Sequence, residues 1–212
     1  MFKTGSIIAG LLVAGLLGAA PAMAQLSLDD IEKQMASGQT ELDRVDALLS
    51  IEDANQRITA MGLLLQTGNP VYIRRALQLG LLSSDPDMQL EALKARLDAG
   101  GPLRFEVDMT ALSGDGLKAW TRLMSGEGTV SVDGKQGTFI LDMAGFDTEK
   151  RCYVQVGNSR YCLAQIAGAK VSFPLANWSR VQGVAALGPD GALTGEFNYD
   201  GYFAPVRIPL VE

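Results

Sequence analysis

The sequence of 212 residues contains no histidine. A Ser-His-Asp triad, a Cys-His pair and histidine-ligated zinc or iron sites are therefore excluded in their usual forms. The glycine patterns GxGxxG and GxxxxGK(S/T), which bind nucleotide phosphates, are also missing. We accordingly predict no catalytic residue, no metal site and no cofactor, and expect a protein that is not an enzyme.

Basic residues are the scarcer charged class. The chain has 18 Lys and Arg against 24 Asp and Glu, a net charge of −6, and no run of basic residues. Affinity for nucleic acid comes mainly from neutralising phosphates, so nucleic acid is not an expected partner. An anionic membrane surface is a poor partner for the same reason.

Long apolar runs are absent except at the N-terminus, where residues 7–20 follow Lys3 and precede Pro21-Ala22-Met23-Ala24. This order is typical of a secretory signal peptide over residues 1–24, cleaved between Ala24 and Gln25. The run is short for a membrane span, and a polar, acidic stretch follows it. We therefore expect a periplasmic or secreted protein without a stable membrane anchor. An uncleaved N-terminal anchor is the alternative.

Cysteine is limited to Cys152 and Cys162. An even number in an oxidising compartment favours a disulfide. The intervening residues alternate around a Gly-Asn turn, so a hairpin centred on Gly157 is expected to place the two cysteines opposite each other. The alternative is a reactive or metal-binding pair.

Helical periodicity is the main signal in residues 25–99, and an internal repeat with a step of 16 residues runs through it. Asp53, Asn69 and Asp85 are suited to cap three helices, and Pro70 and Pro86 suit a first helical position. The other repeating positions are apolar: Ala60, Ala76 and Ala92; Met61, Leu77 and Leu93; Leu65, Leu81 and Leu97.

With these Asx-Pro caps, central alanines and leucines, residues 41–99 resemble the α-hairpin repeats of the HEAT/armadillo class. The resemblance implies stacked antiparallel helices that offer a surface to protein partners, and it implies no chemistry. A plain small helical bundle is the alternative interpretation.

The period changes near Gly100. Leu103, Phe105, Val107 and Met109 alternate with polar residues, as in a half-buried strand. Further short runs are separated by Gly-rich turns, with the last strand expected over residues 206–211 and residues 117–124 ambiguous between strand and helix. The predicted fold class is α+β: a helical-repeat or bundle segment, 25–99, followed by an antiparallel β-sandwich or barrel-like domain, 100–212.

We interpret the chain as an exported, non-enzymatic binding protein whose partner is another envelope protein. Polar residues on the predicted second and third repeat helices form the candidate contact surface. They are Tyr72, Arg74, Arg75, Gln78, Gln89 and Lys94.

Two alternatives use the β domain. A carbohydrate-binding β-sandwich would take a glycan on aromatic and polar residues near the C-terminus, namely Trp178, Tyr199, Asp200 and Tyr202. A carboxylate-dependent hydrolase would need paired acids, and the candidate pairs are Glu106 with Asp108 and Glu196 with Asp200.

Overall fold

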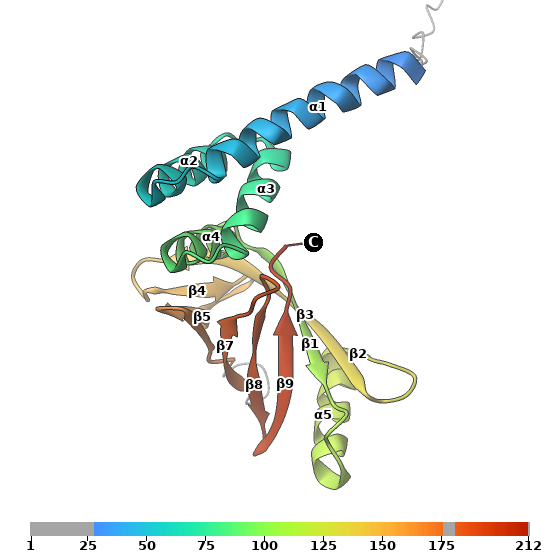
Figure 1. Ribbon diagram of the computed structural model, residues 1–212. Helices are drawn as coiled ribbons and strands as arrows, with labels where there is room; N and C mark the ends of the chain where they lie inside the picture. The colour runs from blue at the N-terminus through green and yellow to red at the C-terminus, as the bar shows by residue number, and fades with distance from the viewer. Residues whose placement is uncertain (1–27, 176–180, 212) are drawn as a thin grey trace, which may run out of the picture. The chain divides into compact units, whose positions relative to one another are not determined.

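The computed structural model describes residues 28–175 and 181–211 (Figure 1). The predicted signal peptide and Trp178 therefore lie outside the described residues. The chain divides into two compact units, Met1–Gly38 and Gln39–Glu212. Of the first unit, the described part is the N-terminal half of helix α1, which spans Leu28–Leu49. All of the other elements belong to the second unit.

Three shorter helices follow α1 with the predicted 16-residue step: α2 (Ala54–Gln66), α3 (Pro70–Leu81) and α4 (Pro86–Asp98). Each begins after the expected cap. The Asp53 carboxylate accepts from the backbone N–H of Gln56, and the Asn69 side chain accepts from that of Val71. Capping is a bond to a neighbour two or three residues away, so sequence alone specifies these helix starts.

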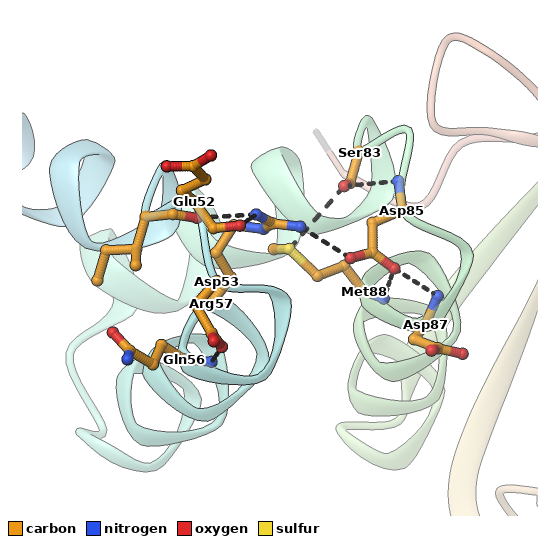
Figure 2. Close-up of polar contacts among 9 residues, drawn as sticks. Glu52, Asp53, Gln56, Arg57, Ser83, Asp85, Asp87 and Met88 are labelled. Carbon is orange, nitrogen blue, oxygen red and sulfur yellow. Dashed lines mark hydrogen bonds and ion pairs between the residues drawn. The ribbon is translucent and has the colours of Figure 1, made fainter.

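Figure 2 shows that the third cap, Asp85, is also linked to α2. Its Oδ1 accepts from the backbone N–H groups of Asp87 and Met88, while its Oδ2 accepts from Arg57 at 2.9 Å. One carboxylate therefore starts α4 and holds the beginning of α2 beside it.

Close approach of α3 to its neighbours depends on a glycine. A Cβ added to Gly80 would lie 2.6 Å from the Ala92 Cβ of α4 and 2.7 Å from the Met61 Sδ of α2. Ala76 and Ala92, two of the repeated alanines, are fully buried. Small side chains therefore allow these helices to pack with little separation.

The nine described strands form one antiparallel sheet. They are β1 (Gly101–Asp108), β2 (Gly128–Val130), β3 (Gln136–Asp147), β4 (Cys152–Gln155), β5 (Asn158–Ala167), β6 (Lys170–Phe173), β7 (Gln182–Leu187), β8 (Leu193–Tyr199) and β9 (Tyr202–Ile208). The strand order is β1-β9-β8-β7-β6-β5-β4-β3-β2, and β1 also pairs with β3. This last pairing closes eight strands into a barrel with β2 as an extra strand. The predicted α+β class is confirmed, and of the two β architectures considered the barrel is the one present.

Helices lie at both ends of the barrel (Figure 1). At one end, α4 is joined to β4 by the Tyr153 hydroxyl, which donates to Asp98 Oδ1 at 2.9 Å. At the other end lies α5 (Gly114–Glu127), so the ambiguous residues 117–124 are helical. Its Trp120 is fully buried and donates from Nε1 to the Tyr202 carbonyl at 3.1 Å.

Aromatic side chains fill the centre of the barrel. Phe105 stacks on Phe139 with ring centroids 4.6 Å apart, and contacts Phe173 and Phe197 edge-on at 5.4 and 5.9 Å. All four rings are at most 1% exposed. This interior is therefore packed with side chains.

The predicted disulfide is present, with Cys152 and Cys162 joined in the β4–β5 hairpin. The expected register is wrong, however, because Cys162 pairs with Val154 and not with Cys152. Gln155 opposes Asn158 across the turn, and the register then shifts on both sides of Val154. A β-bulge of this kind adds residues to one strand, which a simple count from Gly157 does not anticipate.

Candidate functional site

Two residues of the predicted contact surface are engaged within the protein. The Arg75 guanidinium donates to both carboxylate oxygens of Asp46, at 2.6 and 2.5 Å, and the Tyr72 hydroxyl donates to Glu41. Both acids belong to the C-terminal half of α1. Arg75 lowers the pKa of the Asp46 carboxyl, and the bond to Glu41 raises the pKa of Tyr72. These two side chains therefore fix α1 on α3 and are not available as a free surface.

Arg74, on the same helix, is exposed, and within the described parts of the chain its side chain has no hydrogen-bond or ion-pair partner. It lines three neighbouring hollows of about 330, 570 and 370 Å³. Gln78, one turn further along α3, lines the first and the third. We refer to these three hollows together as the α3 groove.

The largest hollow of the α3 groove combines apolar walls with arginine. Its apolar lining comes from α3, β1, β3 and the C-terminal segment: Pro70, Ile73, Leu77, Pro102, Ile140, Pro209, Leu210 and Val211. The charged side chains in its lining are Arg74, Arg96 and Arg104. None of its lining residues is acidic, which contrasts with the net charge of −6 of the whole chain.

Arg96 shapes this hollow by holding three chain segments together. Its guanidinium donates to the carbonyls of Leu210, Gly100 and Pro102, at 2.8, 2.9 and 3.0 Å. These carbonyls belong to the C-terminal segment, the α4–β1 junction and β1. Arg96 is therefore a positioning residue for the wall opposite α3.

The smallest hollow lies between α3 and the turn that joins β7 to β8. Asp190 in that turn accepts from Arg207 Nη2 at 2.9 Å, and Arg207 Nη1 also donates to Glu106 at 3.1 Å. Arg207 lowers the pKa of Asp190 and keeps it ionised. Gly191 in the same turn has φ 73°, a backbone conformation that favours glycine, and a Cβ there would be in van der Waals contact with Leu81 and Leu82.

The remaining predicted contact residues lie elsewhere. Gln89 and Lys94 are on α4, half-buried and exposed respectively, and neither lines the α3 groove. Of the six candidate residues, Tyr72 and Arg75 hold α1, Arg74 and Gln78 line the groove, and Gln89 and Lys94 lie on another helix. Arg75 also lines the third hollow, but its guanidinium is bound to Asp46. The C-terminal segment, residues 209–211, was not among the predicted contact residues. Nothing local in the sequence indicates that these residues lie against α3.

The four candidate catalytic carboxylates occupy different environments. Glu106 is ion-paired with both Arg104 and Arg207. Asp108 accepts from the backbone N–H of Thr110, and hydrogen bonds to Thr110 lower its pKa. Glu196 is in β8, whereas Asp200 is in the β8–β9 turn with φ 51°, so these two acids do not share a strand face.

The residues proposed for glycan binding do not form one exposed plane. Tyr199 packs edge-on against Trp120 with centroids 5.8 Å apart, and Tyr202 lies against Gly116 of α5. Phe203, which was not among the proposed glycan-binding residues, is 59% exposed, whereas Tyr202 is 39% exposed. The last strand begins at Tyr202 and not at residue 206, and alternation with buried Ala204 places Phe203 on the outer surface.

No metal-binding group of three or more His, Cys, Asp or Glu residues occurs among residues 28–175 and 181–211. In the same residues no helix has the length and apolarity needed to cross a membrane. Comparisons with protein-family models, curated proteins and solved structures find no match to this chain.

Proposed function

We propose that the protein is a non-enzymatic exported binding protein that takes a segment of another envelope protein into the α3 groove. The observation that carries this proposal is Arg74, an exposed cation that lines all three hollows and has no partner in the described residues. The Cys152–Cys162 disulfide is compatible with export, because such bonds persist in oxidising compartments.

The lining of the groove defines the chemistry of the partner. Apolar side chains such as Ile73 and Ile140 favour a segment that buries apolar residues, and the arginine-only charge of the largest hollow favours neighbouring carboxylates. Arg74 sits where the hollows meet, so a bound acidic residue beside it would be surrounded by apolar contacts. We therefore expect a segment with acidic and apolar residues in alternation.

Hydrogen bonds within the protein hold both walls of the groove, which supports binding without large rearrangement. One wall is α3, which Arg75 and Tyr72 attach to α1, and the opposite wall is held by Arg96. A preformed site loses less conformational entropy when its ligand binds. This arrangement suits recognition by shape and charge and requires no catalytic group.

Site-specific photo-cross-linking in the producing cells tests the proposal. A photoreactive amino acid at Gln78 should give a discrete adduct with a particular envelope protein, and Arg74→Glu in the same chain should abolish it. Since Arg74 is exposed and unpaired in the described structure, this substitution should change the free energy of unfolding by less than about 0.5 kcal/mol.

The matched control uses Lys94, an exposed cation on α4 outside the groove. Lys94→Glu changes the net charge by the same amount and should leave the adduct from position 78 intact. The absence of any discrete adduct at Gln78, or equal loss with Arg74→Glu and Lys94→Glu, would contradict a binding site in the α3 groove.

A further inference from the structure

A further hollow, of about 680 Å³, lies on the outer surface of the barrel over β6, β7 and β8. Strand pairing arranges its outward-facing side chains in three rows across the sheet. These rows are Lys170, Ala186 and Thr194; Ser172, Val184 and Glu196; and Gln182, Asn198 and Phe203. The hollow shares no lining residue with the α3 groove.

Side chains of β7 and β8 give the hollow both apolar and polar lining. Val184 and Ala186 of β7 are apolar, whereas Lys170 of β6 and Glu196 of β8 carry charges. Phe203 contributes to the lining from β9. The volume falls within the range of about 300–1,000 Å³ that is typical of small-molecule sites.

Three long polar side chains of the hollow are uncommitted, whereas the Ser172 hydroxyl donates to the Gln165 carbonyl at 3.4 Å. Within residues 28–175 and 181–211, the side chains of Lys170, Gln182 and Glu196 have no hydrogen-bond or ion-pair partner. Asn198 Oδ1 accepts from the backbone N–H of Gly201, which directs only its carbonyl oxygen to the turn. The hollow therefore presents donors on Lys170 and Gln182 and an acceptor on Glu196 around an apolar floor.

From this combination we infer that the outer hollow binds a saccharide. Each sugar hydroxyl both donates and accepts, so it can bond to an amide, an ammonium and a carboxylate placed side by side. The C–H face of a pyranose ring is apolar, and it would pack on the exposed phenyl ring of Phe203 and on Val184. A wholly apolar ligand would leave Glu196 and Lys170 desolvated without partners, at a substantial cost.

Titration of the full-length protein with three tetrasaccharides tests the inference: cellotetraose (neutral), chitotetraose (N-acetylated) and tetragalacturonate (acidic). Backbone amide NMR shifts are the readout. At least one probe should bind with a Kd of about 1 mM or tighter, and it should shift amides of β7 and β8 around Val184 and Glu196. Phe203→Ala and Glu196→Gln should each weaken that binding by about tenfold.

Tyr161→Ala is the matched control, because Tyr161 is another exposed aromatic on a strand and does not line the hollow. It should leave the Kd unchanged. Absence of binding by all three probes, or binding that Phe203→Ala and Glu196→Gln do not weaken, would overturn the inference. Either result leaves the α3 groove unaffected, since the two sites have separate linings.

Discussion

Arg57 Nη2 donates to Asp85 Oδ2 at 2.9 Å, although 28 residues separate the two in the chain. The other terminal nitrogen of Arg57 donates to the carbonyls of Ile51 and Glu52, both at 2.8 Å (Figure 2). The α1–α2 connection, the start of α2 and the cap of α4 thus meet at one guanidinium. This contact orders the helices on which the α3 groove depends.

Arg57→Gln should lower the free energy of unfolding at neutral pH and make its further loss in acid shallower than in wild type. The bond from Arg57 is the largest cause of the lowered pKa of Asp85. A lowered folded-state pKa contributes stability that is present above the unfolded-state value, near pH 4, and is lost as pH falls through the folded-state value. In the variant the pKa of Asp85 should rise toward the ordinary value, as measured by NMR titration of its carboxyl carbon. An unchanged titration curve would show that Arg57 does not set this pKa.

Gly195→Ala should destabilise the barrel by about 1–3 kcal/mol or more. A Cβ at this position would lie 2.0 Å from the Val184 carbonyl oxygen and 2.7 Å from the Ala185 Cα, both in the backbone of β7. Neither atom can move without disturbing the strand pairing. Gly62→Ala in α2 is the control. No atom lies within 4 Å of the added Cβ, so this variant should have a free energy of unfolding about 0.5–1 kcal/mol higher than wild type. Urea unfolding compares the two.

Replacing both cysteines by serine should lower the free energy of unfolding by about 2–3 kcal/mol, the amount expected for closing a short loop. The disulfide spans 10 residues of the irregular β4–β5 hairpin. Thermal unfolding of the double variant, compared with wild type with and without reductant, measures the effect. The double variant has no disulfide left to reduce. If reductant lowers its Tm as well, the Tm that wild type loses in reductant would not be due to the Cys152–Cys162 bond.

Tyr153→Phe should cost about 1 kcal/mol at neutral pH, because the hydrogen bond to Asp98 between β4 and α4 is lost. Burial, and then the bond to Asp98, raise the pKa of Tyr153 well above its usual value. A raised folded-state pKa gives stability that is complete below about pH 10 and is lost as pH rises through the folded-state value. The fall in wild-type stability above pH 10 should therefore be shallower in the variant. Identical alkaline slopes would exclude Tyr153 as its source.

Local interactions were readable from the sequence alone. The caps Asp53, Asn69 and Asp85 bond to backbone groups two or three residues away, so their spacing specified where three helices begin. Alternation of Leu103, Phe105 and Val107 likewise identified a strand with one buried face. The disulfide followed from the number of cysteines and their spacing.

Only the tertiary structure decided which distant residues meet. Pairing of β1 with β3 closes the barrel, the bulge in the β4–β5 hairpin displaces Cys162 from its expected register, and Asp46 takes Arg75 out of the candidate surface. The tertiary structure also places the C-terminal segment beside Arg74. Such contacts depend on packing among segments far apart in the chain. A local pattern records which side of an element is apolar, but not which element will cover it.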